Sequence, residues 1–497
     1  MIRKKVKLIG SLIFMINSLT SAQVETICFV KEQFKEDGHI FTSTVADLVA
    51  EDFNGDSRPD IVSIVYEDIE LWVNVDGYFP AHVELVAGLV AGTRMSAADL
   101  ENDRDLDIVF TEMGDPGITV GQVSILINDG TGNFTHEVID PYYIGAQAVS
   151  IVDLDRDGDQ DIVVTGVYQF GLVWCDTSWY ENTGNLHFTK HVFDSYLQGA
   201  SDLDVGDVDG DGDYDILWGD VSAYRFCWFE NDGNQNFTLQ PIDIDQDNIK
   251  FCSLIDLNQN SSLDILLTTE DPEELLFLEN DGNQNFTSNL ICSGYEYPKR
   301  PSAVDLDADG DIDIINAYYS EEHDFVWWEN DGEEHFTLRI IEPFFNQTCS
   351  HRTADINNDG RLDVIAGNGR GGLAWWENQP HIGVDLSMPA HHFRPGNTCS
   401  LNASVFNHTP DDLGELPMFI LMEYTGQFWF YPAWTEEIQF EWVNVTTGFQ
   451  EMPIVDPFTW PEGAGSGSGL YFYGLFTKPD LSKLYGVIDW WNVSWSE

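Results

Sequence analysis

The stretch DLDRDGDQD at Asp153–Asp161 decides the fold, because close copies of it recur at a nearly constant spacing. The seven copies are DFNGDSRPD (Asp52–Asp60), DLENDRDLD (Asp99–Asp107), DLDRDGDQD (Asp153–Asp161), DVDGDGDYD (Asp207–Asp215), DLNQNSSLD (Asp256–Asp264), DLDADGDID (Asp305–Asp313) and DINNDGRLD (Asp355–Asp363). Their starting residues are separated by 47, 54, 54, 49, 49 and 50 residues. A constant period of this length is the signature of a repeat architecture. We name these segments the first to seventh loops and number the positions of each from one to nine.

A second pattern keeps step with the loops. Aromatic-rich segments end in Glu-Asn and lead into a turn, as in WYENTG at Trp179, WFENDG at Trp228, FLENDG at Phe277 and WWENDG at Trp327. In the sixth unit we expect strands at residues 302–304, 314–318, 325–329 and 336–341, with a hairpin at Asp331-Gly332. Adjacent strand residues point to opposite faces, so we expect Trp327 and Trp328 to be buried on the two sides of a sheet.

Four antiparallel strands repeated about every 50 residues are typical of a propeller blade. The sequence therefore predicts an all-β chain with a seven-bladed β-propeller over residues 23–379. A solenoid of stacked hairpins is the competing architecture. The seventh unit stops at Trp375–Asn378 without a fourth strand, and the β-rich segment Thr26–Phe34 precedes the first unit. We expect this N-terminal segment to supply the missing outer strand and so to close the ring.

The acidic loops resemble those of FG-GAP/VCBS repeat proteins, which include the propeller of integrin α-subunits. The resemblance covers residues 23–379, although the Phe-Gly…Gly-Ala-Pro signature is essentially absent, so integrin-type ligand recognition is not implied. It implies calcium ligands from the side chains at positions one, three, five and nine and from the carbonyl at position seven. Carboxylate, amide and carbonyl oxygens are the ligands that Ca²⁺ takes in proteins.

The implied ligand residues differ in charge from loop to loop. The third, fourth and sixth loops offer four carboxylates each: Asp153, Asp155, Asp157, Asp161; Asp207, Asp209, Asp211, Asp215; and Asp305, Asp307, Asp309, Asp313. The first and seventh offer three and an amide: Asp52, Asn54, Asp56, Asp60; and Asp355, Asn357, Asp359, Asp363. The second has Asp99, Glu101, Asp103 and Asp107, and the fifth has Asp256, Asn258, Asn260 and Asp264. We expect several Ca²⁺ ions, up to one per blade, with the fifth loop losing its ion first.

Composition limits the partners of the protein. The chain has 22 Lys+Arg against 85 Asp+Glu and a formal net charge of −63, which excludes nucleic acid as an expected partner, because phosphate binding needs basic patches. Its 43% hydrophobic and 13% aromatic content excludes a disordered acidic tail. No HExxH, GxSxG or Walker motif is present, and the sequence shows no cluster of Lys, Arg or His of the kind that a catalytic propeller would use for uronate or phosphate.

The two ends of the chain differ from the repeats. Residues 1–22 combine four cations, an apolar run and a small-residue end, which is the order of a secretory signal peptide. We therefore expect a secreted or cell-surface bacterial protein, with no transmembrane segment after cleavage of the signal. Residues 380–497 are rich in β-forming and aromatic residues broken by Pro, Gly and Asn, which predicts a small C-terminal β-sandwich.

These observations favour a binding or adhesion module for an extracellular glycan or protein, and not an enzyme. The alternative is an extracellular carbohydrate-active or phosphatase-type enzyme built on a calcium propeller. Because one fold hosts many functions, the fold does not choose between them. The oligomeric state stays open.

Overall fold

The computed structural model describes residues 29–33, 44–65, 67–114, 120–167, 176–194, 200, 202–220, 225–244, 249–318, 325–342, 345, 347–369, 372–378, 382–388, 392–407, 413–424, 427–434, 439–446, 448–459, 466–477 and 484–496. The expected signal peptide at residues 1–22 lies outside these residues. The described residues form strands and no helix, so the predicted all-β class is confirmed.

Seven four-stranded sheets follow one another along the chain. The first six consist of β2 (Val45–Glu51), β3 (Asp60–Val65), β4 (Asp68–Trp72), β5 (His82–Ala87); β6 (Gly92–Ala98), β7 (Asp107–Glu112), β8 (Gly121–Asn128), β9 (Phe134–Tyr143); β10 (Ala146–Val152), β11 (Asp161–Gly166), β12 (Thr177–Asn182), β13 (Phe188–Asp194); β14 (Asp202–Gly206), β15 (Asp215–Asp220), β16 (Arg225–Asn231), β17 (Phe237–Pro241); β18 (Ile249–Ile255), β19 (Asp264–Glu270), β20 (Glu273–Asn280), β21 (Phe286–Ser293); and β22 (Ser302–Val304), β23 (Asp313–Ala317), β24 (Phe325–Asn330), β25 (Phe336–Glu342). Each acidic loop joins the first strand of a sheet to the second. The four strands expected in the sixth unit are those observed, to within one residue at each end.

The seventh sheet takes one of its strands from the beginning of the described chain. Its order is β1-β28-β27-β26, with β1 (Phe29–Gln33), β26 (Thr348–Ala354), β27 (Asp363–Asn368) and β28 (Leu373–Asn378). The strand expected within residues 26–34 is therefore present, and it lies beside β28 as predicted.

Burial increases toward the second strand of each sheet. All six residues of β3, β7, β11 and β27 are buried, whereas most residues of the fourth strands β5 and β9 are exposed or half-buried. A strand that other parts of the protein cover on both faces has a nearly continuous run of apolar residues in its sequence, as in DIVSIV of β3.

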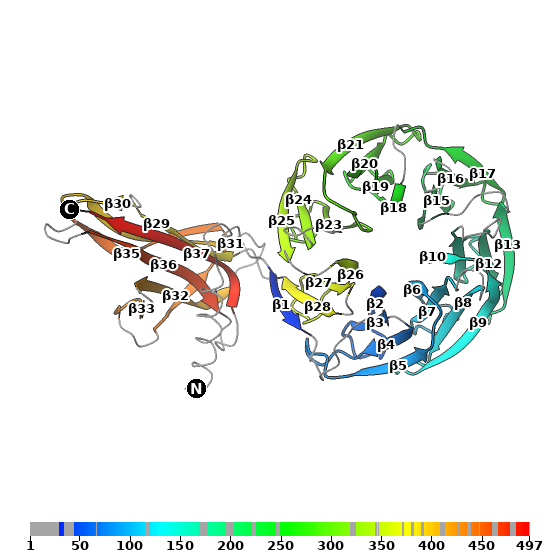
Figure 1. The fold of residues 1–497 in the computed structure, drawn as a ribbon, viewed down its shortest axis with the longest axis horizontal. Coiled ribbons are helices and arrows are strands. Elements are labelled where there is room, and N and C mark those ends of the chain that lie inside the picture. Colours follow the sequence, from blue (N-terminus) through cyan, green and yellow to red (C-terminus); the bar gives the residue numbers. More distant parts are fainter. Residues whose placement is uncertain are drawn as a thin grey trace. The chain divides into compact units, whose positions relative to one another are not determined.

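The sheets pack against their neighbours in chain order, and the last packs against the first. Buried apolar side chains form one cluster for each of the pairs first–second, second–third, third–fourth, fourth–fifth, fifth–sixth and seventh–first. Between the sixth and seventh sheets, Phe325 contacts Trp376 with ring centroids 5.2 Å apart. Figure 1 shows these sheets around a common centre, with β2, β6, β10, β18 and β26 innermost and β5, β9, β13, β17 and β21 outermost. Trp327 and Trp328 are buried, as expected.

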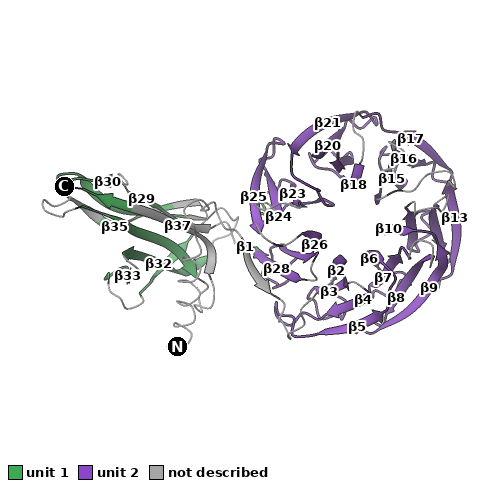
Figure 2. Cartoon of the chain, in the orientation of Figure 1, with its two compact units in different colours: residues 1–30, 307–309, 378–497 green, residues 31–306, 310–377 purple. Residues whose placement is uncertain are grey.

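The chain divides into two compact units, residues 31–306 with 310–377, and residues 1–30 with 307–309 and 378–497 (Figure 2). The C-terminal strands are β29 (Ile382–Ser387), β30 (His392–Phe393), β31 (Thr398–Asn407), β32 (Gly414–Tyr424), β33 (Gln427–Phe430), β34 (Glu441–Val445), β35 (Gly448–Thr459), β36 (Gly467–Thr477) and β37 (Leu484–Trp495).

Hydrogen bonds join these nine strands in one sheet, with the order β33-β32-β36-β37-β29-β31-β35 and with β30 and β34 attached to β37 and β32. The sheet consists of two sets of strands, one containing β33, β32, β36 and β37 and the other containing β29, β31 and β35. The two sets are joined where Gly383 of β29 pairs in parallel with Val487 of β37. One apolar core includes Leu401 and Val405 of β31 together with Met418 of β32 and Val445 of β34. Residues from both sets of strands are therefore buried in a common core. A β-sandwich has two separate sheets, whereas hydrogen bonds join the strands here into one.

Candidate metal sites

Each acidic loop has the same backbone path. Positions four and six have positive φ in all seven loops, with position six occupied by Ser57 (67°), Arg104 (81°), Gly158 (98°), Gly212 (94°), Ser261 (73°), Gly310 (102°) and Gly360 (87°). Glycine adopts this conformation without the Cβ clash that other residues incur, which explains why four of the seven loops have glycine there.

The left-handed residues turn backbone N–H groups toward the start of the loop. In every loop the position-one carboxylate accepts the N–H of position six, at distances from 2.7 to 3.1 Å. The aspartate at position one therefore holds the loop in its curved form even before any ligand is considered.

Position nine is the most deeply buried of the expected ligand positions. Its aspartate is fully buried in all seven loops: Asp60, Asp107, Asp161, Asp215, Asp264, Asp313 and Asp363. In the third loop, Asp161 Oδ2 accepts the N–H of Leu154 at 3.0 Å and Oδ1 accepts the N–H of Asn182 at 2.7 Å. The same two bonds recur in the second, fourth, fifth and sixth loops. This carboxylate therefore has a structural task besides any metal binding.

Three loops bring carboxylates together. The groups are Asp153, Asp155 and Asp161; Asp207, Asp209 and Asp215; and Asp305, Asp307 and Asp313, each with one oxygen per residue lying within 4.8 Å of the others. These are positions one, three and nine of the third, fourth and sixth loops. Position five is outside the groups. In the third and fourth loops, the carboxylates of Asp157 and Asp211 accept the N–H of position seven at 2.9 Å.

In the third loop one of these carboxylates is incompletely hydrogen-bonded. Asp153 Oδ1 is buried, and among the described residues it has no hydrogen-bond partner. Burial, together with the neighbouring loop carboxylates, raises the pKa of Asp161 to about 7. The pKa of Asp215 in the fourth loop is raised to about 7 for the same reasons. A hard divalent cation satisfies crowded carboxylate oxygens of this kind, so the residues present fit Ca²⁺.

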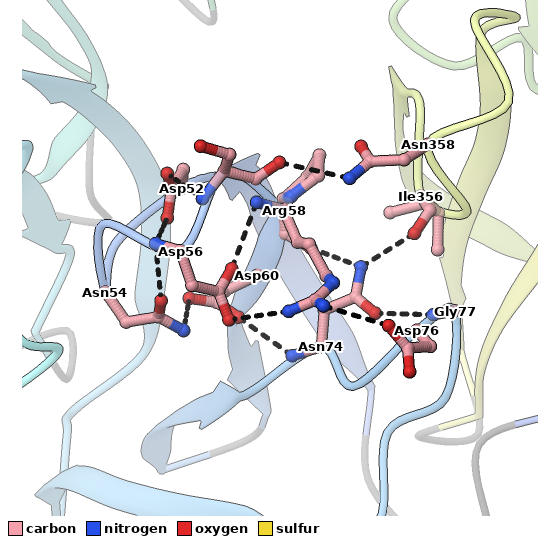
Figure 3. A network of polar contacts seen from close by, with 12 residues as sticks. Asp52, Asn54, Asp56, Arg58, Asp60, Asn74, Asp76, Gly77, Ile356 and Asn358 are labelled. Carbon is pink, nitrogen blue, oxygen red and sulfur yellow. Dashed lines mark hydrogen bonds and ion pairs between the residues drawn. The ribbon is translucent and has the colours of Figure 1, made fainter.

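The first loop is arranged differently (Figure 3). Asn54 Nδ2 donates to Asp60 Oδ2 at 2.9 Å, so the amide at position three is bonded to the carboxylate at position nine. Arg58 at position seven is ion-paired with Asp56 at 3.1 Å and with Asp76 at 2.9 Å. In the seventh loop, Arg361 forms the matching ion pair with Asp359. In both loops an arginine therefore already neutralises the carboxylate expected at position five.

Among the described residues, the second and fifth loops do not bring three carboxylates together as the third, fourth and sixth loops do. In the second loop Glu101 takes the place of aspartate at position three, and its pKa is raised by burial and by Asp103. In the fifth loop, Asp256 Oδ1 and Oδ2 accept the N–H groups of Asn260 and Ser261, at 2.8 and 2.9 Å. Of the 28 expected ligands, the structure thus gathers nine carboxylates at three loops.

Side chains at position four connect successive loops. Asn102 Nδ2 donates to Asp159 Oδ1 at 2.8 Å, and Arg156 forms a 2.6 Å ion pair with Asp213. Asn358 of the seventh loop donates to the carbonyl of Ser57 in the first at 3.3 Å (Figure 3). These contacts fix the loops relative to one another.

The sequence also carried a structural residue whose role was not predicted. An asparagine ends the third strand or follows it closely in each unit, and in five of the units its Nδ2 donates to the carbonyl at position two of the preceding loop. The five bonds are Asn74 to Ile356 (2.8 Å), Asn128 to Phe53 (2.8 Å), Asn182 to Leu100 (2.9 Å), Asn231 to Leu154 (3.5 Å) and Asn280 to Val208 (3.0 Å). The repeated Asn of the Glu-Asn pattern was the signal for this bridge between sheets.

The chain is similar to known repeats in three places. It matches the FG-GAP-like repeat at residues 52–110, 256–316 and 305–366. Each match begins at position one of a loop and ends in the second strand of the following sheet. A comparison with curated proteins finds no match. Within the described part of the chain, no helix has the length and apolar composition that a membrane crossing requires.

Proposed function

We propose that residues 23–379 form a seven-bladed, calcium-binding β-propeller that serves as a binding or adhesion module for an extracellular glycan or protein. The seven sheets that pack in a circle of neighbours support the propeller. FG-GAP-like repeats, which are typical of extracellular proteins, and the signal-like residues 1–22 support a secreted or cell-surface location in a bacterium.

One observation carries the calcium assignment: the same three loop positions bring three carboxylates within 4.8 Å in the third, fourth and sixth loops. Like charges at this distance repel one another unless protons or a cation intervene. We assign one Ca²⁺ ion to each of these loops, with the side chains of positions one, three and nine as ligands. The first, second, fifth and seventh loops are assigned weaker sites.

Thermal melting with EDTA and with millimolar Ca²⁺ tests this assignment. Each site filled at about 100 times its Kd stabilises the folded protein by roughly 2.7 kcal/mol, so Ca²⁺ should raise the melting temperature by several degrees. The variant Asp209→Asn should lose part of this increase. Glu84→Gln is the matched control, because it removes one negative charge from an exposed position on β5. A melting temperature that does not respond to Ca²⁺ would contradict the assignment.

The closure of the propeller has a separate test. β1 is the only described strand of the seventh sheet that comes from outside residues 348–378. Deleting residues 26–34 should lower the stability of the whole propeller, because the outer edge of β28 loses its partner. A truncated protein that melts like the full-length one would show that the ring is closed by other contacts.

The alternative is an enzyme on the same scaffold. It would need cationic or nucleophilic groups gathered in a cleft, which the sequence alone did not reveal. The structure contains one pocket lined by three arginines, Arg94, Arg300 and Arg352, and we propose a binding role for it.

A further inference from the structure

A pocket of about 320 Å³ lies among the first strands of the sheets. It is lined by residues of β2, β6, β18, β22 and β26 or immediately next to them, and the labelled strands of this set lie innermost in Figure 1. Its volume is at the lower end of the range for small-molecule sites, which is about 300–1,000 Å³. The pocket therefore has room for a ligand of the size of one sugar residue.

Three arginines line this pocket: Arg94 on β6, Arg300 just before β22 and Arg352 on β26. Arg94 and Arg300 stand five residues before their loops and Arg352 stands three before its loop, so each lies on or just before the first strand of its unit. Residues about 50 to 260 positions apart are thus brought into one site by the symmetry of the units.

Two of the arginines are partly balanced by buried aspartates. Arg352 Nη2 lies 3.2 Å from Asp47 Oδ1, and Arg300 Nε lies 3.3 Å from Asp202 Oδ2. Among the described residues that line the pocket, Asp47 is the one carboxylate, and its oxygens also accept bonds from Ser350 Oγ at 2.7 Å and from the N–H of Met95 at 3.0 Å. Its hydrogen-bonding capacity is therefore largely used.

Arg94 has no such partner. Among the described residues no hydrogen bond or ion pair to its guanidinium is found, and its Nε is buried without an acceptor. Its Cζ lies 5.5 Å from the ring centroid of Phe251 on β18, so the side chain reaches from the second sheet to the fifth. Burial lowers the pKa of Arg352, Asp47 and Asp202 raise it, and Arg300 and Arg94 lower it further.

Arg94 is half-buried, and its buried Nε is costly because this donor has lost water without gaining an acceptor. It is also exceptional here, because the whole chain has only 22 Lys+Arg. His351, which also lines the pocket, does not add to the charge, because burial and Arg352 lower its pKa to about 3. The lining thus has three arginines and one carboxylate, Asp47, while Asp202 pairs with Arg300 from beside the pocket. Among the described residues, Arg94 is the guanidinium of the three that no carboxylate pairs with.

We propose that this pocket binds the carboxylate, sulfate or phosphate group of a small anionic ligand, with Arg94 as its principal contact and Arg300 and Arg352 beside it. Guanidinium groups match such oxyanions because their planar N–H donors can bind two oxygens at once. The proposal gives the chemical class of ligand for the binding module proposed above, and it rests on that function only for the extracellular source of the ligand.

Binding of ring-matched sugars to the full-length protein tests the proposal. Glucose, glucuronate, glucose 6-sulfate and glucose 6-phosphate would be titrated by calorimetry in Tris buffer with 150 mM NaCl and Ca²⁺, where the Debye length is about 8 Å and distant carboxylates are screened. We expect at least one of the three anions to bind and glucose not to bind. The preferred anion identifies the natural group. Binding of none, or binding of glucose as tightly as the anions, would overturn the proposal.

Variants then locate the site. Arg94→Met removes the guanidinium but keeps an unbranched side chain, and it should weaken binding of the preferred anion at least about tenfold, since a hydrogen bond to a charged group contributes roughly 1.5–3 kcal/mol. Arg339→Met is the matched control, because Arg339 pairs with Glu329 away from the pocket. Unchanged affinity in Arg94→Met would refute the assignment.

A second measurement does not depend on a variant that folds. Cys349 lines the same pocket, so a bound anion should slow its alkylation by N-ethylmaleimide, as read from its peptide by mass spectrometry, and glucose should not. An alkylation rate that the bound anion leaves unchanged would contradict the location. If these tests fail while Ca²⁺ still raises the melting temperature, the anion site is wrong and the calcium propeller stands.

Discussion

The bridge between neighbouring sheets can be measured by comparing two asparagines. Asn182 is fully buried, and its Nδ2 donates to the carbonyl of Leu100 in the preceding loop at 2.9 Å and to the carbonyl of Gln160 at 3.2 Å. The equivalent Asn330 donates within its own sheet, to Ile312 at 3.1 Å, and among the described residues it has no bond to the preceding loop. Both side chains also accept the N–H of a turn glycine at 3.2 Å.

The expected difference follows from this contrast. Asn182→Ala and Asn330→Ala both lose the bonds within the sheet, but only Asn182→Ala leaves the buried carbonyl of Leu100 without its partner from the next sheet. Leaving one buried acceptor unsatisfied costs about 1–3 kcal/mol. Asn182→Ala should therefore lower the free energy of unfolding by about 1–3 kcal/mol more than Asn330→Ala.

Equilibrium unfolding in urea, followed by tryptophan fluorescence at fixed Ca²⁺, measures both values. The two variants change the same side chain at the same place in the repeat, so differences in cavity size and in helix or strand propensity largely cancel. Equal losses, or a greater loss in Asn330→Ala, would refute the reasoning that these asparagines hold neighbouring sheets together.

Three further predictions concern the loops. In millimolar Ca²⁺, Asp264→Ala in the fifth loop should cost less stability than Asp313→Ala in the sixth. Both variants lose the same two hydrogen bonds to backbone N–H groups, but of these two loops the sixth has the group of three carboxylates. The reverse order in thermal melting would show that ligand charge does not rank the sites. Ser261→Gly should stabilise the protein by about 0.5–1 kcal/mol in urea unfolding, because it relieves a positive φ of 73° at position six, and a loss of stability would contradict this. The folded-state pKa of Asp161 and of Asp215, about 7, lies above the unfolded value, so in EDTA their contribution to stability is present below about pH 4 and is lost as the pH rises to about 7. The increase in melting temperature caused by Ca²⁺ should therefore grow over that pH range, because fewer protons compete for the carboxylates. An increase that stays constant with pH would rule out competition between Ca²⁺ and protons.

The repeat structure was predictable because local signals agree with one another. In the sixth unit, alternating or fully apolar runs flank the loop and an Asp-Gly turn follows Trp327 and Trp328, so the strands fall where they were expected. The partner of β28 was predictable because a missing strand at one end of the repeats matched an extra one at the other.

The metal sites were predictable only in part. Composition singled out the third, fourth and sixth loops, and their carboxylates do meet. Position five is an exception, because the spacing of the aspartates does not reveal that the carboxylate of Asp157 bonds to its own loop at position seven. Similarly, only the structure shows that Arg58 and Arg361 turn back onto Asp56 and Asp359.

The arginine pocket was missed because it was sought as a cluster in the sequence. Arg94, Arg300 and Arg352 are far apart in the chain, and they meet only when equivalent strands are placed around one centre. Counting positions back from each loop would have shown that the three residues stand three or five positions before their loops. A search by place in the repeat is therefore more informative for such a chain than a search by neighbourhood in the sequence.

The packing of the last sheet against the first has a consequence for folding. Neighbouring repeats meet after a loop of about 50 residues, whereas Asp47 contacts Ser350 across 303 positions and Thr44 contacts Gly369 across 325. By the (3/2)RT ln n dependence of loop closure, joining the ends directly costs roughly 1.6 kcal/mol more than joining one pair of neighbours. During synthesis the first sheet cannot pack against the seventh until nearly the whole repeat region has left the ribosome, because β26, β27 and β28 are made last. Propagation from any interior pair of sheets toward both ends therefore costs less chain entropy, and we expect the contacts between the first and last sheets to form last and to separate first.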